Sequence, residues 1–231
     1  MNVKSTFVAK KRLFRKNALQ TCDMAVISFP KSGRTWLRNI LSFYWSDLYG
    51  EQVDYEFALS RADINNTVDY PRIYFSHNYF DYFQDIDFSL NKLMDSKWLN
   101  NRKPVFLFRH PLDVTVSYFY HKKFREKIFG GSLEEFIFSP IYGIDRCCQF
   151  MLQMLHLSEK IPLSFNFSYE NLKVHSLKTL CDLLMYWEVD IFEYKLEKAV
   201  KLSTFSEMKK REILSLKGAG GASFFSFRIW A

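Results

Sequence analysis

The sequence predicts an α/β fold: a single domain with a mainly parallel central sheet flanked by helices, and a P-loop-like phosphate-binding turn after the first strand. Three observations favour this fold. Apolar runs without polar alternation, such as Met24–Phe29, are typical of parallel strands covered on both faces. Segments with helical apolar spacing separate these runs. The chain has 231 residues, 48% of them hydrophobic, which is enough to build one packed core.

The first strand leads directly into a turn and a helix. Met24–Phe29 is the predicted strand, Pro30–Arg34 the tight turn and Thr35–Leu48 the helix. The backbone N–H groups of a first helical turn converge on one point, where the helix dipole favours an anion. Lys31 adds a mobile positive charge, so the sequence predicts a phosphate-binding loop. The Walker pattern GxxxxGK[ST] is absent, because Lys31 precedes Gly33 instead of following it.

The remaining elements follow from the same patterns. Further strands are predicted at Pro71–Ser76, Lys103–Arg109 and Ile161–Ser168. Helical apolar spacing predicts helices at Leu112–Phe124, Ile144–Leu157, Leu172–Tyr186 and Phe192–Leu202. Ser132 and Glu135 have the spacing of a capping box. The polar segments Glu51–Tyr70 and Phe80–Asn100 are expected to form loops with short helical turns.

Polar side chains follow two of the predicted strands. His77 comes directly after Pro71–Ser76, and the carboxyl ends of strands in open α/β sheets border the usual ligand crevice. Arg109 ends the next strand, and a guanidinium can bind phosphate through two parallel hydrogen bonds. Ser117 lies eight residues further on and could donate to the same group. The alternatives are a structural loop histidine and an arginine in a surface ion pair.

Composition limits the classes of partner and location. The formal net charge of +7 suits anionic ligands, and no nucleic-acid-binding signature accompanies it. The four cysteines show neither CxxC nor metal-ligand spacing, which favours a reducing, cytoplasmic compartment and no bound metal. We expect neither a signal peptide nor a transmembrane segment, because no apolar run approaches the ~20 residues of a membrane span.

The phosphate-binding turn resembles that of a known family. PKSGRTWL, residues 30–37, is similar to the 5′-phosphosulfate loop of sulfotransferases that use 3′-phosphoadenosine 5′-phosphosulfate (PAPS), where the pattern is near Y-P-K-S-G-T-T-W. FRHPLDVTVSYFY, residues 108–120, resembles the family's 3′-phosphate motif, near R-x-P-x-D-x-x-x-S. The separation of Arg109 and Ser117 matches that motif, whereas His110 stands where family members often carry Asn or Asp.

Three weaker similarities follow in the order that the family shows. YENL at 169–172 resembles Y-E-D-L, STFSEM at 203–208 resembles T-S-F-x-x-M, and LKGAGG at 216–221 resembles R-K-G-x-x-G with Leu216 replacing the Arg. Residues 1–22 are basic and loosely patterned, which predicts an N-terminal arm, and the resemblance predicts a sulfotransferase domain over 23–231. Its C-terminus is expected to be short or altered after about 221, without the family's dimerisation segment.

The resemblance implies transfer of a sulfuryl group from PAPS to an acceptor hydroxyl or amine, with 3′,5′-phosphoadenosine (PAP) as product. It assigns the 5′-phosphosulfate to Lys31, Ser32, Gly33, Arg34 and Thr35, and the 3′-phosphate to Arg109, Ser117, Lys217 and Gly218. It assigns the adenine to Trp36, Tyr169, Ser203, Phe205 and Met208, although Trp36 could equally be a core residue. His77 and Lys31 are the expected catalytic residues. The family's histidine lies in a K-x-H context, whereas Phe75 precedes His77 here by two residues.

Two other functions stay open at this point. A catalytically impaired protein that only binds the nucleotide would account for Leu216 and the altered C-terminus. A nucleotide kinase or NTPase would need Mg²⁺ and carboxylates placed to hold it. The sequence leaves the acceptor open among small molecules, lipids and carbohydrates, and it does not indicate an oligomeric state.

Overall fold

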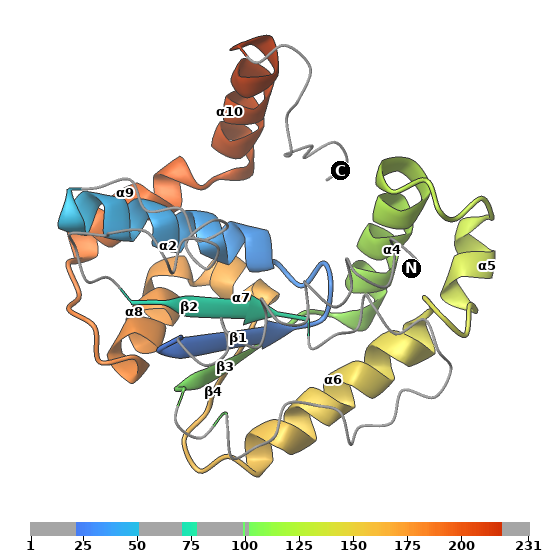
Figure 1. Ribbon diagram of the computed structural model, residues 1–231, viewed down its shortest axis with the longest axis horizontal. Coiled ribbons are helices and arrows are strands. Elements are labelled where there is room, and N and C mark those ends of the chain that lie inside the picture. Colours follow the sequence, from blue (N-terminus) through green and yellow to red (C-terminus); the bar gives the residue numbers. More distant parts are fainter. Residues whose placement is uncertain (1–21, 51–70, 78–98, 100–101, 219–231) are drawn as a thin grey trace, which may run out of the picture.

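The chain folds into three layers, with helices on both faces of a parallel sheet (Figure 1). The computed structural model describes residues 22–50, 71–77, 99 and 102–218, with side chains up to 211. The predicted strands within these residues are present, which confirms the α/β fold class. The predicted loops at Glu51–Tyr70 and Phe80–Asn100 lie almost wholly outside the described residues, as does the N-terminal arm.

The sheet has four strands within the described part of the chain, in the order β2-β1-β3-β4. They are β1 (Met24–Ser28), β2 (Ile73–Ser76), β3 (Pro104–Phe108) and β4 (Phe165–Ser168). All neighbours pair in parallel, and Val26 of β1 faces both Phe75 and Val105. The carboxyl ends of the strands therefore meet at one edge, with the turn after β1 between those after β2 and β3.

Most helices lie where the apolar spacing predicts them. They are α2 (Arg34–Tyr49), α4 (Pro111–Tyr120), η2 (His121–Arg125), α5 (Leu133–Ile137), α6 (Ile144–Glu159), α7 (Tyr169–Val174), α8 (Ser176–Tyr186), α9 (Glu193–Leu202) and α10 (Phe205–Gly218). Ser132 and Glu135 form the predicted capping box at the start of α5. No helix of the described residues combines the length and apolar character needed to cross a membrane.

Two helices differ from their predicted bounds. The expected helix Leu112–Phe124 changes at His121 into a π-helical turn, where the Glu126 N–H bonds to the carbonyl of His121, five residues earlier. The expected helix Leu172–Tyr186 is divided at His175, whose backbone leaves the helical region. α10 extends to Gly218, so the first half of the motif at 216–221 is helical.

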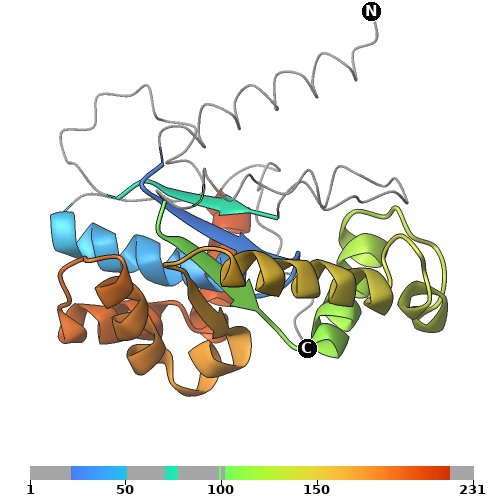
Figure 2. The ribbon, with the colours of Figure 1, turned by 90° about the horizontal axis from the view of Figure 1, so that it is seen from below.

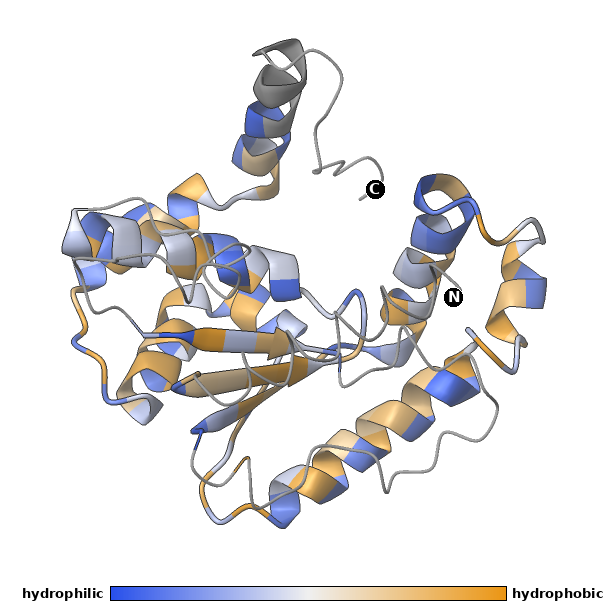
Figure 3. Ribbon diagram, viewed as in Figure 1, coloured by the Kyte–Doolittle hydropathy of each residue, from blue (hydrophilic) through white to orange (hydrophobic). Residues whose placement is uncertain are grey.

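Alternate residues of the strands build two separate cores. Met24 and Val26 face α2, α8 and α9, whereas Ala25 and Ile27 face α4 and α6. Figure 2 shows α6 running along the second face, and Figure 3 shows the apolar character of the strands between the layers. Burial of both faces explains why β1 and β3 are buried along almost their whole length, whereas the edge strand β4, with sequence FNFS, alternates and is partly exposed. These cores fix the strand ends at which the polar residues lie.

All four cysteines of the sequence are free thiols in the structure. Burial raises the pKa of Cys22 to about 11 and that of Cys147 to about 12. The thiolate is the reactive form of cysteine, so both side chains act as small core residues.

Candidate active site

The turn after β1 has the strand–turn–helix geometry that the sequence predicts. Lys31 and Gly33 adopt left-handed backbone conformations, with φ of 70° and 99°. The Ser32 N–H donates to the carbonyl of Phe29 at 3.3 Å, which closes the turn. The Leu37 N–H donates to the carbonyl of Gly33 at 3.1 Å and starts α2. The N-terminal end of α2, with its positive dipole, therefore lies directly after Lys31, where an anion would be favoured.

Gly33 is the position of this turn that leaves no room for a side chain. A Cβ atom there would lie 2.5 Å from Cδ2 of Tyr169, and its φ of 99° is unfavourable for other residues. Tyr169 also contacts Trp36 edge-on, with ring centroids 5.7 Å apart. The first residue of α7 thus packs directly against the phosphate-binding turn.

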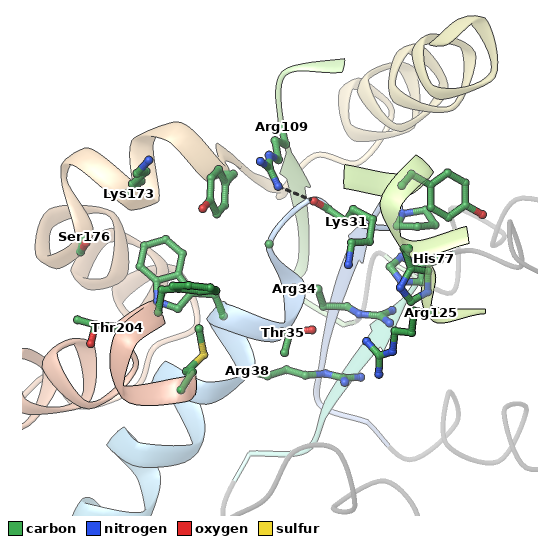
Figure 4. Close-up of a pocket in the computed structure, with 18 of the residues that line it drawn as sticks. Lys31, Arg34, Thr35, Arg38, His77, Arg109, Arg125, Lys173, Ser176 and Thr204 are labelled. Carbon is green, nitrogen blue, oxygen red and sulfur yellow. Dashed lines mark hydrogen bonds between the residues drawn. The ribbon is translucent and has the colours of Figure 1, made fainter. Parts of the chain in front are cut away.

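Arg109 connects the turn after β3 to the turn after β1. Its Nη1 atom donates to the backbone carbonyl of Lys31 at 3.0 Å (Figure 4). Its guanidinium carbon lies 4.4 Å from the ring centroid of Tyr169, a cation–π contact. Residues from the turns after β1, β3 and β4 therefore meet at one point. The strand order explains this contact, because β3 lies between β1 and β4.

Glu170 holds the turn that carries Arg109. Its Oε1 atom accepts a hydrogen bond from the backbone N–H of His110 at 3.0 Å. His110 immediately precedes α4, and Pro111 occupies the first turn of that helix. The acidic residue after Tyr169 therefore holds the backbone of the neighbouring turn.

A cavity of about 900 Å³ lies over these turns. Ten of the residues assigned to the site from sequence line it, namely Lys31, Gly33, Arg34, Thr35, Trp36, His77, Arg109, Tyr169, Phe205 and Met208. Its volume lies in the range of about 300–1,000 Å³ that is usual for small-molecule pockets. Among the residues that the structure describes, no three His, Cys, Asp or Glu side chains are grouped to hold a metal ion.

Other assigned residues lie away from the cavity wall. Ser32 and Ser203 are completely buried, and neither hydroxyl has a hydrogen-bond partner among the described residues. Ser117 is half-buried on α4 and does not line the cavity. Lys217 and Gly218 end α10, beyond the residues whose side chains are described.

Several lining residues were missed by the sequence argument. They are Arg38, Tyr118, His121, Arg125, Glu126, Lys173, Ser176 and Thr204. For some of them, the spacing of residues along a predicted helix could have indicated a place at the cavity. Arg38 follows Arg34 by one helical turn, and the spacings of three and four that join Tyr118, His121 and Arg125 place them on one helix face.

Lys31 is a partly buried cation among other cations. Its pKa is lowered to about 8, first by burial and then by the charges of Arg125 and Arg109, while Glu126 acts in the opposite direction. A lysine in this setting is stabilised by any anion that enters the cavity, because the anion offsets both effects. The phosphate-binding turn is therefore electrostatically prepared for a negatively charged ligand.

His77 is held in one tautomer at the end of β2. Its Nδ1 atom lies 2.8 Å from the backbone carbonyl of Ser28. A carbonyl oxygen only accepts hydrogen bonds, so Nδ1 carries the proton in this contact. In the neutral ring Nε2 is then the basic nitrogen. Figure 4 shows His77 at the same end of the cavity as Lys31 and Arg125.

The chain belongs to the sulfotransferase domain family, whose sequence profile matches residues 22–219. Among curated relatives, the amine sulfotransferase of Oryctolagus cuniculus is 23% identical over 209 residues, covering 81% of this chain and 63% of the relative. Sulfotransferase 1 family member D1 of Mus musculus is 24% identical over 215 residues, covering 81% and 66%. The chain thus spans just under two thirds of the length of these relatives.

Two solved structures share the fold of this chain. Mouse sulfotransferase SULT7A1 complexed with PAP superimposes with a TM-score of 0.56 at 18% identity, covering 81% of this chain and 66% of the other. Retinol dehydratase in complex with androsterone and PAP gives a TM-score of 0.60 at 16% identity, covering 86% and 71%. The family resemblance predicted from the two phosphate motifs is confirmed.

Proposed function

We propose that this chain transfers a sulfuryl group from PAPS to a hydroxyl or amine of an acceptor and releases PAP. One observation carries the proposal: Lys31 and Arg109, from two separate phosphate motifs, line one cavity and are joined by a 3.0 Å hydrogen bond. PAPS has an anionic group at each end of its adenosine, so it needs two cationic clusters within one cleft. The PAP bound to both structural neighbours supports this choice of ligand.

The proposed donor site has three parts. Lys31, Gly33, Arg34 and Thr35 line the cavity and would hold the 5′-phosphosulfate, and the resemblance adds Ser32, whose side chain is buried behind them. Arg109 would hold the 3′-phosphate, and the resemblance adds Ser117, Lys217 and Gly218. Trp36, Tyr169, Phe205 and Met208 line the cavity and would surround the adenine, and the resemblance adds Ser203, which is buried behind them. The aromatic contact between Trp36 and Tyr169 supports a stacking surface at this end of the cavity.

The reaction follows from the two catalytic residues. Nε2 of His77 takes the proton of the acceptor hydroxyl or amine, and the acceptor atom forms a bond to sulfur. The bond between sulfur and the bridging oxygen breaks, and its electron pair stays on the phosphate of PAP. The Lys31 ammonium stabilises the charge that develops on that oxygen. Positioning of both substrates in one cavity supplies much of the rate enhancement, and no metal is required.

We also propose a class of acceptor and a cellular location. The androsterone and retinol bound to retinol dehydratase, and the name of the rabbit amine sulfotransferase, favour small hydroxyl or amine compounds. The cytoplasmic location stays a prediction, to which the four free thiols lend support.

The test separates donor binding from transfer. Calorimetry should show that PAP binds the wild-type protein, and that binding is lost in Lys31→Ala and in Arg109→Ala. His77→Ala should keep PAP binding and lose transfer of radiolabelled sulfate from PAPS to a panel of phenols, lipids and oligosaccharides. Lys178→Ala is the matched control, because Lys178 pairs with Asp182 on an exposed face of α8.

Two outcomes would favour the other functions. Preference for ATP over PAP, with a requirement for Mg²⁺, would indicate a kinase or NTPase. Tight PAP binding without transfer to any acceptor would indicate a non-catalytic nucleotide-binding protein, the possibility that Leu216 raises. Unchanged transfer by His77→Ala would remove the proposed base.

A further inference from the structure

The π-helical turn η2 brings an additional cation to the cavity. Tyr118, His121 and Arg125 line the cavity from one face of the continuous helix formed by α4 and η2. The turn is closed by the N–H of Glu126, which donates to the carbonyl of His121 at 3.0 Å. Single π-helical turns are rare and occur frequently at functional sites. The turn therefore places side chains of η2 at the cavity wall.

Glu126 anchors η2 from its C-terminal end. Its Oε1 atom accepts from Nε2 of His121 and its Oε2 atom accepts from Nζ of Lys122, each at 2.8 Å. The Lys122 side chain is only 7% exposed and lies 4.9 Å from the ring centroid of Tyr118. Both oxygens of the Glu126 carboxylate are thus engaged. Arg125, the neighbouring residue, has no ion-pair partner within the described part of the chain.

Arg125 lies at the end of the cavity that holds His77. Figure 4 shows its guanidinium near His77, with the side chains of Arg34 and Arg38 at the same end. Among the described lining residues, Glu126 is the only carboxylate, so the described wall here is positively charged. Arg125 lowers the pKa of Lys31 more than Arg109 does, although Arg109 bonds to the Lys31 backbone. Arg125 is therefore electrostatically close to the Lys31 ammonium.

We infer that the acceptor carries a negatively charged group, a carboxylate, sulfate or phosphate, and that Arg125 binds it while the acceptor hydroxyl or amine lies at His77. The inference rests on the proposed function and names its substrate class. The two phosphate motifs already provide cations for both ends of the donor. Arg125 belongs to neither motif and faces the residue proposed as the base.

A guanidinium suits this role for two reasons. Its planar fork forms two parallel hydrogen bonds to a carboxylate, sulfate or phosphate, which fixes the orientation of the acceptor as well as its charge. A neutral acceptor would leave the charge of Arg125 without a counter-charge from the acceptor, so the site would discriminate against it. Arg125 is thus a specificity-determining residue for the proposed reaction.

Two probes of nearly equal shape test the charge requirement. The binding of 4-hydroxyphenylacetate and of its methyl ester to the PAP-saturated protein is measured by calorimetry. The wild-type protein should bind the carboxylate about tenfold or more tightly than the ester, the size expected for a charge-assisted hydrogen bond. Arg125→Gln should remove this preference, and Arg125→Lys should keep part of it. Lys160→Gln, at the exposed end of α6 and outside the cavity lining, should keep it fully.

The outcomes separate this inference from the proposed function. Equal binding of the two probes to the wild-type protein, or no binding of either, overturns the inference. The proposed function still stands in that case if the protein binds PAP and transfers sulfate from PAPS. A preference that survives in Arg125→Gln also overturns the inference. If PAP fails to bind, but the protein without nucleotide shows an Arg125-dependent preference for the carboxylate, the anion site stands and the proposed function fails.

Discussion

The side chain of Arg109 donates a hydrogen bond to the backbone carbonyl of Lys31 at 3.0 Å. Lys31 has a φ of 70°, a conformation that costs a residue with a side chain roughly 1–2 kcal/mol. The hydrogen bond helps to hold this conformation. The residue proposed to bind the 3′-phosphate therefore also supports the turn proposed to bind the 5′-phosphosulfate. The two halves of the donor site should behave as one unit.

Arg109→Lys is expected to weaken PAP binding about 10- to 100-fold, as measured by calorimetry. A lysine keeps the charge but loses the planar fork, the bond to the Lys31 carbonyl and the stacking on Tyr169. Arg102→Lys, at the other end of β3, should bind PAP as the wild type does. Wild-type affinity in Arg109→Lys would show that charge alone is sufficient and that the two halves are independent.

Gly33→Ala and Gly50→Ala separate backbone strain from steric exclusion. Both glycines have positive φ, 99° and 71°. Only at Gly33 would an added Cβ atom meet another side chain, that of Tyr169. Each variant should lose about 1 kcal/mol of unfolding free energy through the backbone. Only Gly33→Ala should also displace Tyr169 and weaken PAP binding, by at least about tenfold. Chemical denaturation and calorimetry measure the two effects, and comparable PAP affinity in both variants would contradict this account.

The sequence was sufficient for the features that depend on strand ends. Parallel strands covered on both faces are apolar throughout, so a single polar residue after each strand is conspicuous. Lys31, His77 and Arg109 could be identified in this way, and the strand order places them at one edge. The β2-β1-β3-β4 order itself could not be predicted, because nothing in four short apolar runs specifies their neighbours.

The sequence was insufficient where a side chain's position depends on how a helix packs. Arg38 and Arg125 both line the cavity, but periodicity alone cannot decide which face of a helix meets it. The π-helical turn that carries Arg125 was not predicted, because apolar spacing favours one continuous α-helix over Leu112–Phe124. Tyr169 was assigned to the adenine, whereas its contacts with Gly33 and Arg109 could be found only in three dimensions.

PAP binding should depend on pH through Lys31. The pKa of its ammonium is lowered to about 8, so the charge is present at pH 7 and is lost as the pH rises above 8. We expect PAP affinity to fall about tenfold or more between pH 7 and 9.5, since a charge-assisted hydrogen bond is lost. Lys31→Arg should bind PAP with little change over this range, because a guanidinium stays charged. A flat wild-type profile would contradict the assignment.

The same partly buried lysine should reduce the stability of the fold. Its pKa is about 8 in the folded protein and near 10.5 in the unfolded chain, so below pH 8 the folded state bears the full cost of burying the charge. Lys31→Met should therefore be more stable than the wild type at pH 7, by on the order of 1–3 kcal/mol. This advantage should decrease as the pH rises from 8 towards 10.5. Urea denaturation at several pH values measures it, and a Lys31→Met protein less stable at pH 7 would exclude this cost.

Glu126→Gln should destabilise the fold by about 1 kcal/mol at pH 7, because it removes the negative charge next to the buried ammonium of Lys122. Hydrogen bonds from His121 and then from Lys122 lower the pKa of Glu126 to about 2, against the effect of burial. The Glu126 side chain is 37% exposed, so solvent screens the pair and the expected loss is smaller than for a fully buried one. The loss is measured by urea denaturation.

The pH dependence of this difference has a definite sign. The pKa of Glu126 is lower in the folded protein than its usual value of 4.5, so its contribution is complete above about pH 5 and is lost as the pH falls towards 2. The stability difference between wild type and Glu126→Gln should therefore be constant from pH 7 to 5 and shrink below 4.5. Glu197→Gln is the control, because Glu197 lies 3.8 Å from Lys201 on an exposed helix face, where such pairs contribute about 0.5 kcal/mol or less. Equal losses in the two variants would show that η2 does not depend on the charge of Glu126.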